Sequence, residues 1–288
     1  MSNHVTGHTG LLCLLGSPVA HSISPEMHNE ACALLDLDYE YLAFDVGADD
    51  LQTAVEGLRK MGVRGFNLTM PDKNRMAELC DELSPAAKIA GAVNTVVNDN
   101  GRFIGYTTDG IGYMMSAKDA GVDLVGKRMV QLGAGGAGTG VLVQAAIDGV
   151  AAIDVFNAKD AFWPRVERIV AELNEQTSCR VSLHEITDLD TLRACTDKAD
   201  LLLNTTPVGM TRIPGCLIPD ASYFHEGLVV SDVIYEPKET ALLKMAREAG
   251  LKTFNGMYML LYQGAASFKL WTGRDMPTEP IKAKYFAG

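Results

Sequence analysis

The stretch VQLGAGGAGTG, residues 130–140, decides the fold of this chain. The apolar residues that open it indicate the end of a buried strand, and residues 133–138 fit the pattern G-x-G-x-x-G. The apolar run at residues 141–147 is helical in pattern and is closed by Gly149. A strand, a glycine turn and a helix in this order favour a dinucleotide-binding unit over a turn that merely uses glycine.

Each glycine of this turn has a physical purpose. Gly133 permits the tight turn, Gly135 lets the backbone approach a pyrophosphate, and Gly138 lets the helix pack closely on the strand. The free N–H groups and the positive end of the helix would then face the phosphates. The turn residues that we expect to bind the cofactor are Gly133, Ala134, Gly135, Gly136 and Ala137.

The composition indicates a globular protein of one large or two ordinary domains, with 288 residues of which 47% are hydrophobic. A net charge of -11 without a basic block argues against nucleic acid and anionic membranes as partners. The first ten residues lack the features of a signal peptide, and no apolar run could span a bilayer. Six scattered cysteines indicate reduced thiols in a cytoplasmic protein, and neither they nor the six histidines have metal-ligand spacing.

Strands and helices alternate in the first third of the chain, which predicts a mainly parallel sheet. The strands are expected at residues 11–15, 39–46 and 63–68, with helices at residues 25–35 and 50–61 between them. Gly62 is expected to end the second helix. Residues 99–101 predict a hairpin turn between strands at residues 92–98 and 102–107. Ser22 and Ser24 lie two apart, so in extended chain their hydroxyls point the same way and could hold a carboxylate ligand. Ser24 could instead only cap a helix that starts at Pro25.

Three polar residues further on are candidates for chemistry. Lys73 ends the segment NLTMPDK and falls in the first turn of a helix, where the dipole disfavours a cation and suits a proton-transfer group. The alternative is an exposed surface lysine. Asn94 opens an apolar strand, and Asp109 precedes a helix at residues 111–120. Asn94 could be a satisfied strand-end amide. Asp109 is either an N-cap or a carboxylate that pairs with Lys73 and with a substrate hydroxyl.

The second half continues the dinucleotide-binding pattern. The strand at residues 151–156 ends in Asn157-Ala-Lys-Asp160, where such folds contact the adenosine ribose. Asp160 and the lack of an arginine favour NAD over NADP, although Lys159 could still meet a phosphate. Further strands at residues 199–204 and 227–233 lead into loops expected to face the ligand. Thr205 and Pro207 in the first of these loops are expected to bind the cofactor. A long apolar helix at residues 257–271 carries one conspicuous amide, Gln263.

Taken in order, these motifs resemble the shikimate dehydrogenase family, and most of all its quinate/shikimate dehydrogenases. The resemblance covers nearly the whole chain and rests on an ordered set of segments rather than on any one of them. The matching segments are SISP at 22–25, NLTMPDK at 67–73, GAVNT at 91–95, TDG at 108–110, the glycine turn, NTTPVGM at 204–210, DVIYEP at 232–237 and the stretch around Gln263.

The resemblance implies an α/β fold with two domains. A discontinuous substrate domain would comprise residues 1–109 and 255–288, and a Rossmann-like domain residues 110–254, with the active site in the cleft. Ser22 and Ser24 would hold the substrate carboxylate, assisted by Thr69. The residues implied at the ring hydroxyls are Lys73, Asn94, Asp109 and Gln263, with Lys73 as acid/base and Asp109 orienting it. Val233, Tyr235 and Gly256 would border the nicotinamide, and residues 157–160 would bind the rest of the cofactor.

The chain departs from the family pattern at two places. NADP-dependent members usually carry Asn-Arg-Thr where this chain has Asn157-Ala-Lys159, and Tyr258 replaces a glycine near the expected nicotinamide pocket. The change at Tyr258 has no physical explanation in the sequence.

The sequence therefore predicts an NAD-preferring enzyme that interconverts shikimate and 3-dehydroshikimate, quinate and 3-dehydroquinate, or both, as a monomer or a homodimer. One alternative is a biosynthetic NADP-dependent shikimate dehydrogenase. Another is a catalytically silent sensor that binds NAD and a cyclohexene-carboxylate.

Overall fold

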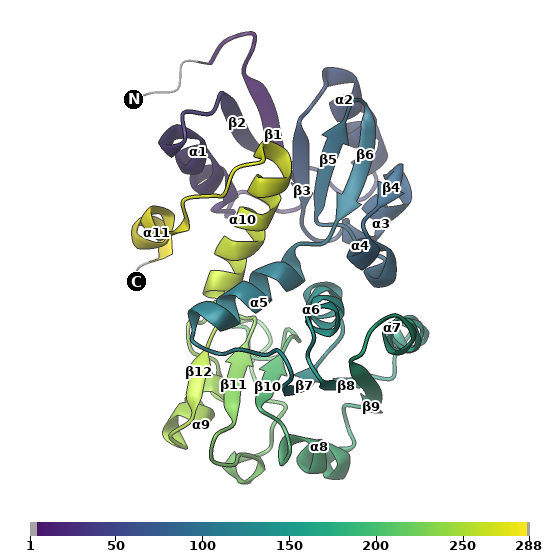
Figure 1. The fold of residues 1–288 in the computed structure, drawn as a ribbon, viewed down its shortest axis with the longest axis vertical. Helices are drawn as coiled ribbons and strands as arrows, with labels where there is room; N and C mark the ends of the chain where they lie inside the picture. The colour runs from purple at the N-terminus through teal and green to yellow at the C-terminus, as the bar shows by residue number, and fades with distance from the viewer. Residues whose placement is uncertain (1–4, 287–288) are drawn as a thin grey trace. The chain divides into compact units, whose positions relative to one another are not determined.

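The computed structural model describes residues 5–286, so the start of the stretch compared with a signal peptide and His4 lie outside the described residues. The chain divides into two compact units (Figure 1), one running up to Thr108 and resuming at Leu261, the other from Asp109 to Leu260. Each unit contains one six-stranded sheet. The return to the first unit falls inside helix α10 (Met257–Thr272) rather than before it, where the sequence placed it.

The first unit has a mixed sheet with the order β2-β1-β3-β5-β6-β4. Strands β2, β1 and β3 are parallel, whereas β5 is antiparallel to both β3 and β6. The strands are β1 (Gly10–Gly16), β2 (Tyr39–Asp45), β3 (Gly65–Leu68), β4 (Glu82–Leu83), β5 (Thr95–Asp99) and β6 (Arg102–Tyr106). The helices are α1 (Ser24–Leu34), α2 (Leu51–Met61), α3 (Lys73–Leu79), α4 (Pro85–Ala90), α11 (Thr278–Ile281) and a π-turn at Lys282–Phe286, besides most of α10.

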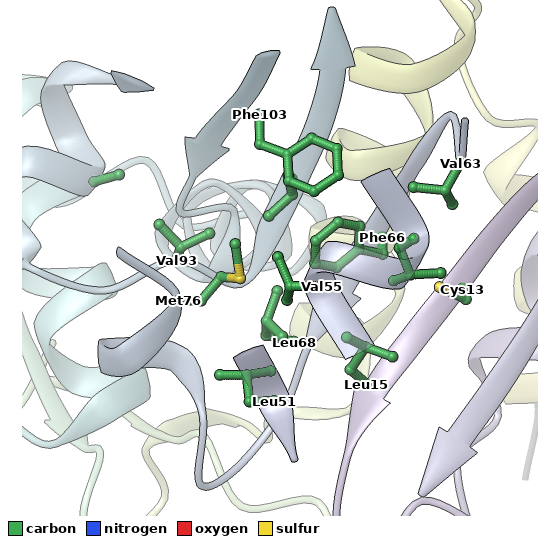
Figure 2. Close-up of a cluster of buried hydrophobic side chains, with 13 residues drawn as sticks. Cys13, Leu15, Leu51, Val55, Val63, Phe66, Leu68, Met76, Val93 and Phe103 are labelled. Carbon is green, nitrogen blue, oxygen red and sulfur yellow. The ribbon is translucent and has the colours of Figure 1, made fainter. Parts of the chain in front are cut away.

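Strand β1 is buried on both of its faces, as its unbroken apolar run predicts. Cys13 and Leu15 pack into one cluster with side chains of α2 and α3, which Figure 2 shows together with Phe66 and Met76. The alternate residues of the strand, Leu12 and Leu14, belong to a second cluster that contains Trp271 of α10. The parallel part of the sheet is thus covered by helices on both sides, which leaves its carboxyl edge for polar residues.

The predicted hairpin between β5 and β6 is confirmed. Asn100 and Gly101 both have positive φ, at 52° and 90°, as the tight two-residue turn between antiparallel strands requires. The predicted glycine stop after the helix at residues 50–61 is also confirmed, since Gly62 caps α2 with a φ of 70°.

The second unit has an all-parallel sheet with the order β12-β11-β10-β7-β8-β9. Its strands are β7 (Arg128–Leu132), β8 (Ala152–Asn157), β9 (Arg180–Glu185), β10 (Leu201–Asn204), β11 (Val229–Asp232) and β12 (Lys252–Phe254). Its helices are α5 (Asp109–Asp119), α6 (Gly136–Ile147), α7 (Trp163–Gln176), α8 (Leu189–Thr196), the 3-10 turn η1 (Ala221–Tyr223) and α9 (Ala241–Glu248). Side chains of α8 and α9 share one buried cluster with Val130 and Leu132 of the central strand. The two-domain α/β prediction is therefore confirmed.

Two expectations about the whole chain can be compared with the described residues. No helix within residues 5–286 is long and apolar enough to cross a membrane. All six cysteines lie in this range and are free thiols.

Candidate active site

The loops after β1 and β3 carry Ser22, Ser24 and Thr69. Gly16, at the end of β1, has a φ of +154°, and a Cβ there would overlap the side chain of Thr69. The two loops therefore lie directly against one another. This follows from the parallel pairing of β1 with β3, because the carboxyl ends of neighbouring parallel strands meet at one edge of a sheet.

The expectation that Ser24 caps a helix is wrong. Helix α1 includes Ser24 as its first residue, and the capping position is taken by Ile23, whose side chain makes no cap bond. The N–H of Ser24 donates to Oγ of Ser22 at 3.2 Å, so the two serines form the turn that enters the helix. The argument from extended chain does not apply to them.

Lys73 is the first residue of α3, in the helical turn that the sequence predicted. The residue is half-buried, which disfavours the alternative of an ordinary surface lysine. The backbone carbonyl of Lys73 accepts the N–H of Val93 at 2.8 Å. This bond places the start of α3 beside the segment that contains Asn94.

Asn94 is the centre of a buried polar network and not just a strand-end amide. Its Oδ1 accepts the N–H of Thr108 at 2.8 Å, and its Nδ2 donates to Oγ1 of the same threonine at 3.0 Å. The same amide nitrogen lies 3.5 Å from Oε1 of Gln263, on α10. The structure thus brings together two predicted site residues, Asn94 and Gln263, that are far apart in the sequence.

The residues that hold this network were missed by the sequence analysis. Asn67 donates through Nδ2 to the carbonyl of Asn94 at 3.0 Å and to the hydroxyls of Thr95 and Ser267 at 3.0 and 3.1 Å. Its Oδ1 accepts the phenolic O–H of Tyr41 at 2.8 Å. All of these side chains are buried. One signal was available, because Asn67 is a polar residue in an otherwise apolar strand, and a buried amide needs partners.

Asp72 is a second residue that the sequence analysis missed. It precedes Lys73, is only 1% exposed, and neither of its carboxylate oxygens has a hydrogen-bond partner. Although it stands at the capping position of α3, its side chain makes no cap bond. Burial raises the pKa of this carboxyl above its usual value. Such a group costs stability when it is ionised.

Replacing Asp72 by asparagine should raise the melting temperature at pH 7 by about 2–4 °C, since a buried unpartnered charge is removed. The raised pKa means that the folded state holds the proton more tightly than the unfolded state. The parent protein therefore loses the contribution of protonated Asp72 to its stability as the pH rises through the pKa of this carboxyl in the folded state. The gain should shrink toward pH 4, as followed by thermal unfolding between pH 4 and 8.

Asp49→Asn, an exposed position in the same unit, is the control and should leave the melting temperature unchanged. A gain of equal size at pH 4 and pH 7 would show that the carboxylate charge is not the cause.

The glycine turn of the second unit has the predicted geometry. Gly133 has a φ of +91°, which confirms its place in the tight turn. A Cβ on Gly138 would overlap the Thr205 hydroxyl and lie 2.9 Å from the carbonyl oxygen of Gly133, which confirms close packing. Gly135 and Gly136 are exposed and have nothing within 4 Å of a Cβ position. Helix α6 begins at Gly136, five residues before the predicted run, so its N-terminus lies within the turn.

Two side chains hold the shape of the turn by hydrogen bonds to its backbone carbonyls. Gln131, which is fully buried, donates to the carbonyls of Gly133 and Gly138 at 2.9 and 2.8 Å. The hydroxyl of Thr205 donates to the carbonyls of Leu132 and Gly133 at 3.0 and 2.8 Å. The sequence analysis missed Gln131 and assigned Thr205 to the cofactor. In the structure both side chains hold the backbone of the turn.

The segment after β8 is tied both to the glycine turn and to β9. Oδ1 of Asn157 accepts the N–H of Ala134 at 2.9 Å. Nζ of Lys159 lies 2.5 Å from Oε1 of Glu185, the last residue of β9. Asp160 is exposed, and its Oδ1 accepts the N–H of Phe162 at 2.8 Å.

The loops after β10 and β11 contain the remaining predicted cofactor residues. Gly256 lies against Val233, since a Cβ on the glycine would overlap the valine carbonyl. Tyr235 is 42% exposed, and Pro207 lies in the loop after β10. The sequence analysis missed Asp232, which ends β11 and accepts hydrogen bonds from Ile234, Asn204 and Thr240. Burial raises the pKa of this carboxyl to about 6.

A cluster of potential metal ligands forms where the sequence showed no metal spacing. Asp154, His184 and Cys195 place one ligand atom each within 4.8 Å of one another. Nε2 of His184 and Oδ1 of Asp154 are 3.1 Å apart, and Sγ of Cys195 lies within 4.8 Å of both residues' ligand atoms. Burial, with Asp154 adding to it, raises the pKa of Cys195 to about 11, which keeps the thiol protonated. The contacts within the cluster agree with a structural role for Asp154.

Known proteins match this chain over nearly its whole length. Models of the shikimate dehydrogenase substrate binding domain and of the shikimate 5'-dehydrogenase C-terminal domain match residues 14–96 and 256–284. The shikimate dehydrogenase (NADP(+)) of Listeria monocytogenes is 47% identical over 287 residues, 99% of each chain. The chain belongs to the shikimate dehydrogenase family. It is an oxidoreductase that acts on a CH–OH group with NAD(P).

Two solved structures that are similar to this chain are both complexes with NAD. Shikimate 5-dehydrogenase from Listeria monocytogenes, in complex with shikimate and NAD, is 46% identical with a TM-score of 0.94 over 98% of both chains. Quinate dehydrogenase from Corynebacterium glutamicum, in complex with NAD, is 30% identical with a TM-score of 0.85 over 96% of this chain and 99% of that one. The resemblance drawn from the motifs is confirmed at the level of the family. The preference for NAD or for quinate is not supported by the relative that shares 47% of its residues.

The predicted site residues come from both units. Ser22, Ser24, Thr69, Lys73, Asn94 and Gln263 lie in the first unit, and the cofactor residues lie in the second. Asp109 is the first residue of α5 and directly follows Thr108 of the polar network. It therefore begins the second unit, within the helix and not ahead of it.

Proposed function

We propose that the chain interconverts shikimate and 3-dehydroshikimate with NAD(P)(H). The observation that supports this best is the buried network that fixes Asn94 and Gln263 in the unit that also carries the two serines and Lys73. A small ligand rich in hydroxyls needs amide groups held in one orientation, because each hydroxyl both donates and accepts. The 47% identical relative is named as a shikimate dehydrogenase, which agrees with this assignment.

The substrate-binding roles are proposals that follow from residue chemistry. Ser22, Ser24 and Thr69 donate hydroxyl hydrogen bonds to the substrate carboxylate. Ser22 and Thr69 belong to the loops after β1 and β3, which are neighbouring strands, and Ser24 begins α1. Asn94 and Gln263 bind ring hydroxyls. Thr108 holds the Asn94 side chain, and the amide of Asn94 in turn contacts Gln263. Little rotational freedom of Asn94 is therefore lost when the substrate binds.

Lys73 is the proposed acid/base, with Asp109 to orient it. In the oxidation, the Lys73 amine accepts the proton of the carbinol hydroxyl as the C–O bond becomes a carbonyl. In the reverse direction the ammonium returns that proton to the oxygen. NAD(P)⁺, when bound, would supply the acceptor for the hydride of the same carbon. The substrate would then lose two electrons with the hydride, while the hydroxyl proton passes to Lys73.

The residues of the second unit fit a dinucleotide. Gly135 and Gly136 leave open space at the N-terminus of α6, where backbone N–H groups are available to a pyrophosphate. Asn157 and Thr205 hold the turn in this shape. Val233, Tyr235 and Gly256 are proposed to border the nicotinamide.

The choice between NAD and NADP has support on each side. The curated relative is named as NADP-dependent, and this favours the NADP-dependent alternative over the NAD preference expected from Asp160. The Listeria structure with NAD, together with Ala158 in place of an arginine, supports use of NAD. We therefore propose that both nucleotides are accepted, with NADP the better of the two.

Initial rates in a two-by-two design test this proposal, with shikimate or quinate as substrate and NAD⁺ or NADP⁺ as cofactor. We expect shikimate with NADP⁺ to give the highest kcat/KM, measured as the absorbance of the reduced nicotinamide. Faster turnover with NAD⁺ would restore the preference argued from Asp160. Binding of shikimate and nucleotide without turnover would instead favour the sensor alternative.

The oligomeric state and the compartment stay predictions. Strand β2 lies at the edge of its sheet, and its residues Leu42 and Phe44 are 47% and 39% exposed. This exposed edge is compatible with a monomer and with a homodimer joined along β2. Six free thiols agree with a reducing cytoplasm.

A further inference from the structure

We propose that Glu185 determines how well the enzyme uses NADP, by competing with the 2′-phosphate of the cofactor for Lys159. The inference rests on the proposed function, because it concerns the adenosine end of the same cofactor site. It assigns to Glu185, a residue of the neighbouring strand, control over a cation that the sequence left ambiguous.

The position of Glu185 follows from the register of two parallel strands. Strands β8 and β9 pair so that Asn157 lies opposite Glu185, at the carboxyl end of each strand. The N–H of Ile186 donates to the carbonyl of Asn157 at 3.0 Å, which fixes this end of the pair. The end of the second strand of a dinucleotide-binding unit is where the adenosine ribose is recognised. Glu185 therefore lies beside the segment that distinguishes the two cofactors.

Lys159 is the cation of this segment, and Glu185 already binds it. Their charged atoms are 2.5 Å apart, and both side chains are largely exposed, at 62% for the lysine and 44% for the glutamate. The hydrogen bond and charge of Glu185 raise the pKa of Lys159, so the lysine stays a cation. An exposed pair of this kind is weak, so a ligand with a stronger negative charge can displace the glutamate.

The other charged neighbour of Lys159 is Glu167, which raises the pKa of the lysine less than Glu185 does. Nζ lies 5.6 Å from the centre of the Trp163 ring, and the indole N–H of Trp163 donates to Glu167 at 2.8 Å. The carboxylate of Asp160 accepts a backbone N–H. Glu185 is thus the carboxylate that pairs directly with Lys159, while Glu167 and Asp160 have other partners among the described residues.

The charge balance explains why this residue affects one cofactor and not the other. NAD has two hydroxyls on its adenosine ribose. These hydroxyls are uncharged and do not need Lys159, so the ion pair does not compete with their binding. NADP offers a phosphate, which needs the lysine and is repelled by a free carboxylate. With Glu185 present, binding of NADP must both break the ion pair and leave a carboxylate next to the phosphate.

The test compares Glu185→Gln with the parent enzyme and with Lys159→Met, alone and combined. Glu185→Gln should raise the ratio of kcat/KM for NADP⁺ to that for NAD⁺ by about three- to tenfold. The gain should be lost in the Lys159→Met background, and it should fall as salt is raised. Glu172→Gln, which removes an equal charge from another exposed pair of the same unit, is the matched control and should leave the ratio unchanged.

Dissociation constants of NADP⁺ and NAD⁺, measured by titration calorimetry without substrate, separate this proposal from the proposed function. A shift in their ratio in Glu185→Gln supports the inference even if neither shikimate nor quinate is turned over. A ratio changed less than twofold in Glu185→Gln overturns it. An equal gain in the Lys159→Met background also overturns it, because the effect would then not pass through the lysine.

Discussion

Replacing Lys73 by methionine should lower kcat for shikimate oxidation by about 10²–10⁴-fold, the range that a positioned acid/base group contributes. The methionine keeps the length and apolar stem of the lysine but can neither accept nor donate the proton of the carbinol. Its fold should persist, because the backbone carbonyl that binds Val93 is unchanged. Steady-state rates over a range of pH, together with the dissociation constant of the nucleotide, measure the effect.

Lys88→Met is the matched control, because Lys88 is an exposed lysine of α4 in the same unit. It should retain the parent kcat. Nucleotide binding in Lys73→Met should stay within about twofold of the parent, since the proposed cofactor residues belong to the second unit. A kcat within tenfold of the parent would remove Lys73 from the role of acid/base.

Local patterns predicted those parts of the fold that local physics determines. The glycine turn, the hairpin at Asn100 and Gly101 and the buried strand β1 each depend on neighbouring residues, so the sequence was sufficient for them. Lys73 was likewise placed in the first turn of a helix because Pro71 and the apolar spacing indicate where that helix starts. Ser24 was misplaced because capping was judged from residue type, whereas the chain is already helical at Ser24.

The polar network could not be derived from the sequence in the same way. Its members Tyr41, Asn67, Asn94, Thr108 and Ser267 come from five segments, and the bond between Asn67 and Ser267 joins residues 200 positions apart. No periodicity relates such positions, and a buried amide accepts many different partners. Family resemblance supplied Asn94 and Gln263, which are expected to touch the substrate, but not the residues that orient them.

The ion pair of Lys159 with Glu185, which bears on cofactor specificity, also could not be predicted from the local sequence. The sequence placed Lys159 at the ribose end of the cofactor site but did not show whether its charge was available. The answer depends on a residue 26 positions later, brought opposite by the register of two strands. Cofactor preference argued from residues 157–160 alone therefore omitted the carboxylate that pairs with the lysine.

The glycine turn should respond to a methyl group in two different ways, depending on the position. Gly138→Ala places its Cβ on the Thr205 hydroxyl and near the Gly133 carbonyl, so the helix must move away from the strand. Overpacking of this kind costs about 1–3 kcal/mol of stability. The variant should therefore lose several degrees of melting temperature, and nucleotide binding with it, because Thr205 holds the turn.

Gly135→Ala should leave stability unchanged and still weaken nucleotide binding. Its Cβ meets nothing within 4 Å, and its φ of -72° suits any residue, so the folded protein has no reason to change. The methyl group does project from the part of the turn that a pyrophosphate must approach. The loss of one charged hydrogen bond there corresponds to about ten- to a hundredfold in the dissociation constant. Melting temperatures and calorimetric titrations of both variants give the comparison. If Gly135→Ala bound NAD(P)⁺ as tightly as the parent, the pyrophosphate would not lie at this turn. Equal melting temperatures for the two variants would show that Gly138 is not needed for close packing.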